Sequence, residues 1–178
     1  MDRDRARQLA GEMLLYCFAA MLLTGGYLAF FYTPSGAEVA YDGWYAPLRG
    51  TPISEAYASM LRISTEVPGG LRVRQIHAGT TTVLALGATL WAVLGRVGPG
   101  LAVLCLAGVL AVSGQAAADE PAFVALPVPV WYALHLAAAL AVLVTLVVCS
   151  RREAARRPRT PAFTALAIGL TLLLIFVF

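Results

Sequence analysis

The chain has 178 residues, of which 60% are hydrophobic and only 13% are charged. A soluble domain carries about twice that charged fraction, so this composition excludes an ordinary cytosolic globular protein and a disordered chain. A formal net charge of +3 with so little polar sequence gives no indication of a nucleic-acid-binding surface. We therefore expect a polytopic membrane protein that contacts lipid over most of its length.

Four apolar segments are each long enough to cross about 30 Å of hydrocarbon at about 1.5 Å per residue. They are residues 9–32, 70–95, 98–118 and 128–150. A fifth apolar segment, residues 162–178, is shorter, and we expect it to span as well. The predicted fold is therefore all-α: a transmembrane four-helix bundle with a fifth C-terminal transmembrane helix, forming one membrane domain over residues 1–178.

The arginines predict the orientation of these spans. If the spans alternate in direction, nine arginines share the side of the N-terminus: Arg3, Arg5, Arg7, Arg96, Arg151, Arg152, Arg156, Arg157 and Arg159. The other side has only four arginines, together with six acids that include Glu120. Because arginine accumulates in cytoplasmic loops, we expect the N-terminus in the cytoplasm and the chain in a bacterial inner membrane.

The expected extracytoplasmic loop, residues 33–69, is far longer than a connection needs, so it should have structure of its own. Ile53, Tyr57, Met60 and Leu61 recur at helical spacing, which predicts an amphipathic helix over residues 53–66. This helix would lie on the outer membrane face or cap the bundle, and the pattern favours neither. The aromatic residues at 41, 44 and 45 would form a docking surface or a belt that anchors the loop.

The sequence has two histidines, His77 and His135, and each lies about seven residues into a span from its outer end. Both should therefore sit roughly 10 Å below the outer boundary. An ionisable side chain inside a span is a candidate functional residue, although a membrane histidine can also serve as an interhelical hydrogen-bonding residue. Two neutral imidazoles facing each other at one depth are what a six-coordinate haem iron needs.

Three further residues lie near the same depth. Gly25 in the first span and Gly114 in the third would let a macrocycle approach the backbone closely, or would serve ordinary close helix packing. Arg74, one turn before His77, could neutralise a haem propionate, or could be an interfacial arginine that reaches towards water.

These residues also carry a resemblance to a known family. Residues 23–32 are similar to the motif L-T-G-x-x-L-A-x-x-Y, residues 56–77 match A-x-x-S-x-x-x-I-x-x-x-V-x-x-G-x-x-x-R-x-x-H without a gap, and residues 131–135 are similar to F-[FY]-[AS]-[FL]-H. Together they resemble the N-terminal four-helix, haem-binding half of cytochrome b of the b and b6 type. The resemblance implies that His77 and His135 ligate one haem b near the extracytoplasmic face, that Arg74 binds a propionate, and that Gly25 is a close-approach glycine.

The departures from the family are equally specific. The family has a second histidine 14 residues after each of these, where this chain has Trp91 and Cys149. We therefore expect the second haem to be absent. Gly11 matches the family's glycine beside that second haem, which lies nearer the inner face. The depth of Gly114 favours a match to the family's glycine beside the outer haem. The half of the family that carries the Pro-Glu-Trp-Tyr quinol motif is missing from this sequence.

A single haem near one face cannot carry electrons across the whole bilayer, so we expect an electron-transfer subunit of an oxidoreductase complex rather than a stand-alone enzyme. It would pass electrons between an extracytoplasmic partner (an Fe–S protein, a cytochrome c or another redox protein) and the quinone pool or another membrane haem. The sequence leaves open whether a quinone site lies on this chain and whether the chain forms a homodimer. The alternative is a haem-free structural subunit built on a cytochrome b scaffold. A transporter is disfavoured because no broken helix is evident.

Overall fold

The computed structural model describes residues 2–119 and 126–177. Within them the elements are α1 (Arg3–Phe31), β1 (Glu38–Ala40), the 3-10 helix η1 (Ala46–Leu48), β2 (Pro52–Ser54), α2 (Glu55–Thr65), α3 (Gly70–Val93), α4 (Val97–Asp119), α5 (Val128–Arg156) and α6 (Pro161–Val177). Four of these helices, α1, α3, α4 and α5, are long and apolar enough to cross a membrane. The predicted all-α polytopic membrane bundle is confirmed. Glu120 and most of the expected connection between the third and fourth spans lie outside the described residues.

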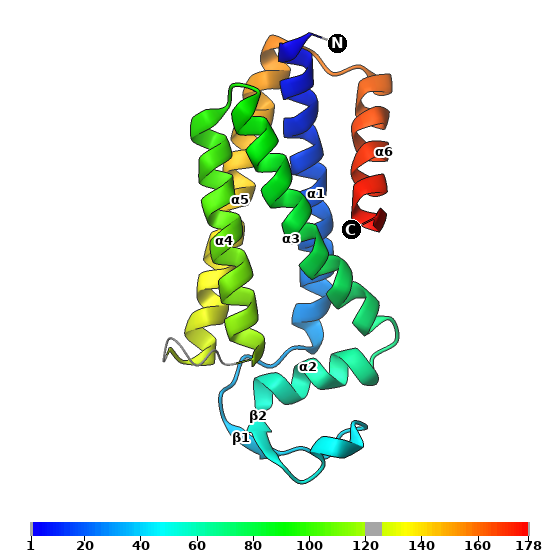
Figure 1. Cartoon of the computed structure of the whole chain (residues 1–178), viewed down its shortest axis with the longest axis vertical. Helices are drawn as coiled ribbons and strands as arrows, with labels where there is room; N and C mark the ends of the chain where they lie inside the picture. Colours follow the sequence, from blue (N-terminus) through cyan, green and yellow to red (C-terminus); the bar gives the residue numbers. More distant parts are fainter. Residues whose placement is uncertain (1, 120–125, 178) are drawn as a thin grey trace.

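The four long helices form a ring in which each contacts two neighbours. Helix α3 packs against α1 and α4, and α5 packs against α4 and α1. The start of α1, the turn between α3 and α4 and the end of α5 therefore share one end of the bundle, and α2 with the β1–β2 hairpin lies at the other (Figure 1). The helices on opposite corners of the ring, α3 and α5, face each other across its interior.

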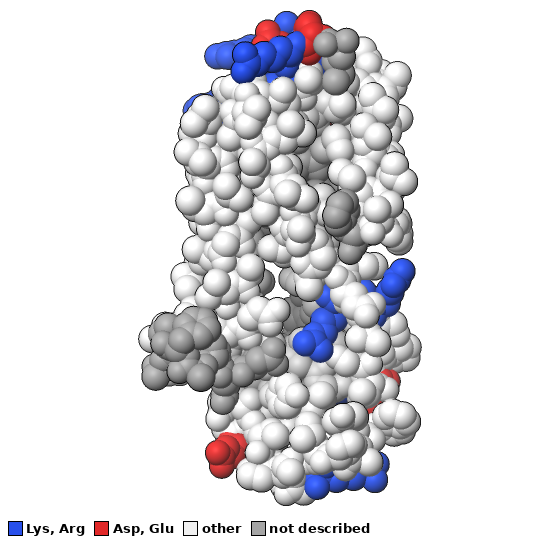
Figure 2. All heavy atoms as spheres, viewed as in Figure 1, with Lys and Arg blue, Asp and Glu red and all other residues white. Residues whose placement is uncertain are grey.

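In the view of Figure 2, charged side chains cluster at one end of the molecule, a broad uncharged band follows, and further charged side chains lie from just below the middle to the other end. This distribution fits a bundle whose middle lies in hydrocarbon, where an unpaired charge is costly. At the end formed by the start of α1, all four acids pair with arginines: Asp2 with Arg157, Asp4 with Arg7 and Arg157, Glu12 with Arg159, and Glu153 with Arg7 and Arg96. These ion pairs involve four of the nine arginines predicted to share one side, namely Arg7, Arg96, Arg157 and Arg159.

Two helices extend well beyond their predicted spans. Helix α1 starts at Arg3 rather than residue 9, because Asp2 caps it by accepting a hydrogen bond from the Arg5 backbone N–H at 2.7 Å. Helix α5 continues to Arg156 rather than ending at residue 150. Hydropathy delimits only the apolar part of a helix, whereas the backbone hydrogen bonds continue into the polar sequence outside the bilayer.

Helix α6 lies against the outside of α1. Its Phe163 and Ala167 pack on Leu9, and the Thr171 hydroxyl lies 3.4 Å from the backbone carbonyl of Met13. At about 1.5 Å per residue its 17 residues extend about 26 Å, slightly less than the hydrocarbon thickness. The fifth membrane crossing therefore stays a prediction.

The segment between α1 and α3 contains the predicted helix and also a β-hairpin that the sequence pattern did not predict. Strands β1 and β2 pair antiparallel, with Val39 opposite Ile53. Ile53 thus lies in a strand and not in the predicted helix, because Ser54 caps α2 by accepting a hydrogen bond from the Tyr57 backbone N–H at 3.1 Å. The fully buried face of α2 is Ala56, Ser59 and Ile63, and this helix contacts α1, α3 and α4. These contacts place α2 across one end of the bundle, and its position on the outer membrane face stays a prediction.

Candidate functional site

The two histidines meet across the interior of the bundle. His77 lies in the third turn of α3 and His135 in the third turn of α5, the two helices on opposite corners of the ring. Their ring centroids are 6.2 Å apart, and the ring planes are inclined by 54°. Both side chains are half-buried. Helix packing therefore brings together two side chains that are 58 positions apart in sequence.

This separation fits a metal ion held between two imidazoles. A metal–imidazole bond is about 2 Å long, and the ring centre lies about 1 Å beyond the nitrogen, so two axial imidazoles place their centroids about 6 Å apart. The described residues include no group of three or more His, Cys, Asp or Glu side chains that could hold a metal ion. A haem needs only two protein ligands, because the macrocycle supplies the others.

Each histidine lies against a glycine of a neighbouring helix. A Cβ atom on Gly25 of α1 would lie 2.9 Å from Cε1 of His77, and one on Gly114 of α4 would lie 3.1 Å from Cε1 of His135. Gly26, which shares the depth of Gly25, has nothing within 4 Å of such an atom. In this structure each glycine leaves room for an imidazole, and the expected close approach of a macrocycle to the two glycines stays a prediction.

Both imidazoles also have hydrogen-bonding partners at Nδ1. Nδ1 of His77 lies 3.0 Å from the Thr24 hydroxyl. Nδ1 of His135 lies 3.1 Å from the Leu110 carbonyl oxygen and 3.2 Å from the Ser113 hydroxyl. The sequence analysis missed Thr24 and Ser113, although each one directly precedes a candidate glycine.

Arg74 does not reach towards His77. Its guanidinium donates a hydrogen bond to the hydroxyl of Ser64 in α2 at 3.1 Å. The side chain is half-buried at the join between α2 and α3. Its role as a propionate ligand stays a prediction, and the contact seen here is a link between the capping helix and the bundle.

The inner half of the bundle is filled with side chains. Trp91 is 1% exposed and packs against Gly11, where an added Cβ would lie 3.2 Å from the indole Nε1. Gly11 lies 14 positions before Gly25, and Trp91 lies 14 positions after His77. The contact between a glycine of α1 and an aromatic ring of α3 therefore recurs about four turns nearer the inner end. Cys149 is half-buried at the edge of the apolar cluster that contains Trp91. These residues do not fit a second haem, because indole is not an iron ligand.

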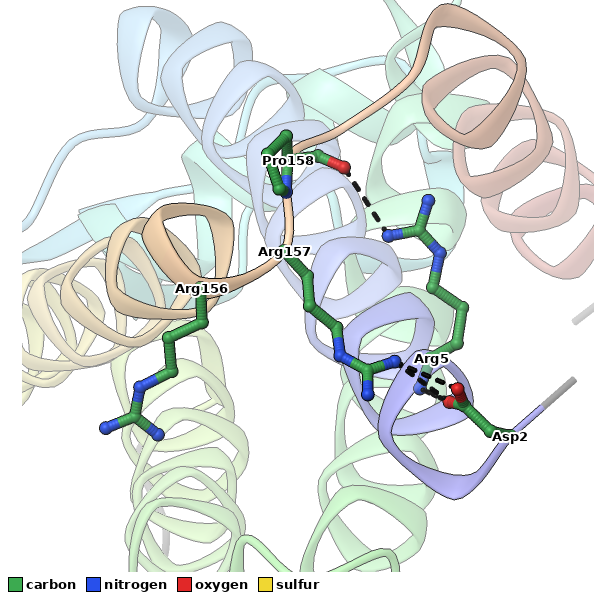
Figure 3. A pocket seen from close by; sticks show the side chains of 5 residues that line it. All are labelled: Asp2, Arg5, Arg156, Arg157 and Pro158. Atoms are coloured by element: carbon green, nitrogen blue, oxygen red, sulfur yellow. Dashed lines mark hydrogen bonds and ion pairs between the residues drawn. The ribbon is translucent and has the colours of Figure 1, made fainter.

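An open, polar surface pocket of about 560 Å³ lies at the end of the bundle away from the histidines (Figure 3). It is lined by Asp2, Arg5, Arg156, Arg157 and Pro158. Arg157 donates to both carboxylate oxygens of Asp2 at 3.0 Å. The backbone N–H of Arg5 and then this guanidinium hold the pKa of Asp2 below its usual value. These contacts tie the start of α1 to the end of α5 and form no part of the histidine site.

The fold and the site together define a helical membrane bundle with one pair of facing histidines. No protein-family model matches the chain. It is 51% identical over 79 residues to a protein of Streptomyces coelicolor, 58% over 69 residues to one of Mycobacterium leprae, and 54% over 69 residues to one of Corynebacterium efficiens. Each of these relatives is named cytochrome bc1 complex cytochrome b subunit.

The resemblance to the cytochrome b family is thereby confirmed for the matched part of the chain. That part is 39–44% of this chain and 12–14% of the length of these relatives. The matched segment is thus a small share of a much longer relative, and the activity of the whole relative does not transfer with it.

Proposed function

We propose that this chain is a membrane-embedded subunit of a respiratory redox complex that holds one b-type haem between His77 and His135. The observation that carries the proposal is the pair of imidazoles at 6.2 Å between centroids, contributed by opposite helices of the bundle. The glycine facing each ring and the similarity to cytochrome b subunits support it.

In this function the residues of the chain have distinct tasks. His77 and His135 would hold the iron from its two faces, and Gly25 and Gly114 leave the space that the two rings occupy. A bound haem would supply reversible one-electron chemistry. The apolar cluster on the inner side of the histidines excludes water from that side of the site.

The site would lie near the extracytoplasmic face. The excess of arginine at the opposite end of the bundle supports this orientation. The electron partners would then be an extracytoplasmic redox protein on one side and the quinone pool or another membrane haem on the other. The filled inner half, with Trp91 packed on Gly11, supports one haem rather than two.

One observation favours the haem-free alternative. The Nδ1 atoms of both histidines already have hydrogen-bonding partners, Thr24 for His77 and Leu110 with Ser113 for His135. A structural subunit could use the two residues in this way to hold α3 to α1 and α5 to α4. The two functions differ in whether the folded protein contains haem.

A visible spectrum of the full-length protein, purified from haem-supplemented cells, tests the proposal. We expect a Soret band, reducible α and β bands, and about one haem per chain by pyridine haemochrome assay. His77→Ala and His135→Ala should each remove the six-coordinate spectrum, because one axial imidazole is lost. Cys149→Ser is the matched control and should keep both spectrum and haem content.

Folded protein without a Soret band would contradict the proposal and support the haem-free subunit. Two haems per chain would contradict the single-haem claim, and loss of haem in Cys149→Ser would point to a thiolate ligand. Helical content by circular dichroism separates each of these results from simple misfolding.

A further inference from the structure

The hydroxyl-bearing residues beside the two histidines form a repeated pattern. We propose that Thr24 and Ser113 are positioning residues that keep the proton of each imidazole on Nδ1 and so present Nε2 of His77 and of His135 to the iron. This inference rests on the proposed haem function, because it concerns the same two imidazoles.

The hydrogen bonds of Thr24 assign the proton of His77. A hydroxyl has one proton to donate, and the Thr24 hydroxyl has two carbonyl acceptors in its own helix, Ala20 at 2.8 Å and Met21 at 3.1 Å. The hydroxyl oxygen can then only accept from Nδ1 of His77, which lies 3.0 Å away. Nδ1 therefore carries the proton, and the lone pair of Nε2 stays free.

The hydrogen bonds of Ser113 give the same result for His135. The Ser113 hydroxyl donates to the Val109 carbonyl oxygen at 2.6 Å, also four residues back. Nδ1 of His135 lies 3.1 Å from the Leu110 carbonyl oxygen, which can only accept, so Nδ1 must be the donor. Ser113 at 3.2 Å is a second acceptor for the same proton. Nε2 of His135 is again the unprotonated nitrogen.

The same local arrangement of a hydroxyl residue and a glycine occurs beside both histidines. Each hydroxyl residue is followed directly by the glycine that the same imidazole touches, Thr24 by Gly25 and Ser113 by Gly114. Helix α1 serves His77 of α3, and α4 serves His135 of α5 in the same way. The hydroxyl fixes Nδ1 and the glycine admits the Nδ1–Cε1 edge of the ring, so Nε2 is the nitrogen farther from the supporting helix.

This arrangement should affect both the affinity for iron and the redox balance. An acceptor at Nδ1–H makes an imidazole a more basic ligand, and removing such a partner typically weakens metal binding about 10–100-fold. A more basic ligand favours the ferric state, so losing the acceptor should move the midpoint potential in the positive direction. His135 keeps Leu110 as an acceptor, so the effect should be larger at His77.

The experiment compares Thr24→Val and Ser113→Ala in the full-length, haem-loaded protein. Thr24→Val should weaken haem binding about 10–100-fold and shift the midpoint potential upwards, and Ser113→Ala should do both to a smaller extent. Thr24→Ser, which restores a hydroxyl, should return both quantities towards wild type. Thr89→Val is the matched control, since its exposed hydroxyl bonds the Ala85 carbonyl of its own helix.

The outcomes separate this inference from the proposed function. A wild-type protein without haem contradicts the proposed function itself. A wild-type protein with haem whose affinity and potential are unchanged in Thr24→Val would overturn only the positioning role. A loss of haem that Thr24→Ser does not restore, or that Thr89→Val shares, would also overturn it, because it would report packing rather than the hydroxyl.

Discussion

The imidazoles of His77 and His135 depend on neighbouring helices for space and for a hydrogen-bond acceptor. The space comes from one glycine each, at positions where any larger residue would meet the ring. Gly25 and Gly26 are adjacent in sequence and equal in depth, yet only Gly25 touches a histidine. The rotation of α1 about its axis therefore decides which of the two glycines belongs to the site.

This difference predicts opposite results for two single substitutions. Gly25→Ala places a Cβ 2.9 Å from the His77 ring, so it should lower the free energy of unfolding by about 1–3 kcal/mol and reduce haem content. Gly26→Ala is the matched control and should raise the free energy by up to about 1 kcal/mol, because alanine favours a helix. Denaturant unfolding and the Soret absorbance report the two effects, and equal haem content in both variants would contradict the prediction.

At the scale of the elements, ion pairs fasten the helices at the end away from the histidines. Glu153 near the end of α5 is 6% exposed and accepts from Arg7 of α1 at 3.2 Å and from Arg96, between α3 and α4, at 2.8 Å. One carboxylate thus joins three parts of the ring. Glu12 has the corresponding role for α6, because it holds Arg159 at 2.8 Å in the segment that leads into that helix.

Replacing Glu153 should loosen this end of the bundle. Glu153→Gln leaves Arg96 without its counter-ion and leaves Arg7 paired with Asp4 alone, and it should lower the free energy of unfolding by roughly 1–3 kcal/mol. That is less than the about 3–5 kcal/mol expected for a fully buried pair, since each arginine side chain is 24% exposed. The exposed Glu38→Gln is the control and should change little. Unfolding followed by circular dichroism measures both, and no difference between them would show that the network contributes nothing.

At the scale of the whole molecule, the bundle has two unlike halves. The half that contains the histidines places the two imidazoles in the interior, and the other half closes around Trp91, Phe18 and Leu84, with the buried carboxylates Glu12 and Glu153 at its end. The sequence alone indicated this difference, because Trp91 and Cys149 stand where the family has its second pair of histidines. In the structure the indole of Trp91 occupies the space beside Gly11.

The inner half of the bundle, which contains Trp91, should contribute to the stability of the fold and should not bind a haem. Trp91→Ala should lower the free energy of unfolding by about 3–5 kcal/mol, because it opens a cavity against Gly11. We expect haem to stay at about one per chain in the protein that remains folded. Trp44→Ala is the control, since that side chain is 70% exposed. A second haem in any folded Trp91 variant, or no loss of stability, would contradict this view.

Parts of the fold and of the site were accessible from the sequence. Hydropathy located the four long helices, and counting residues from the span ends placed His77 and His135 at one depth. The contacts of Arg74, the buried face of α2 and the strand that contains Ile53 did not follow, because each depends on neighbours that are remote in sequence. The local pattern around 53–61 could not reveal that Ala56, Ser59 and Ile63 would face the bundle.

The sequence by itself determined that the chain belongs in a membrane, that both of its histidines lie inside the spans, and that the second histidine pair is absent. Those features depend on composition and on distance along a helix, both of which are local. Only the tertiary structure decided that His77 and His135 face each other, that Gly25 and not Gly26 adjoins the site, and that Thr24 and Ser113 hold the rings. Those features depend on how each helix is rotated and which helices are neighbours, and packing among all the helices sets both.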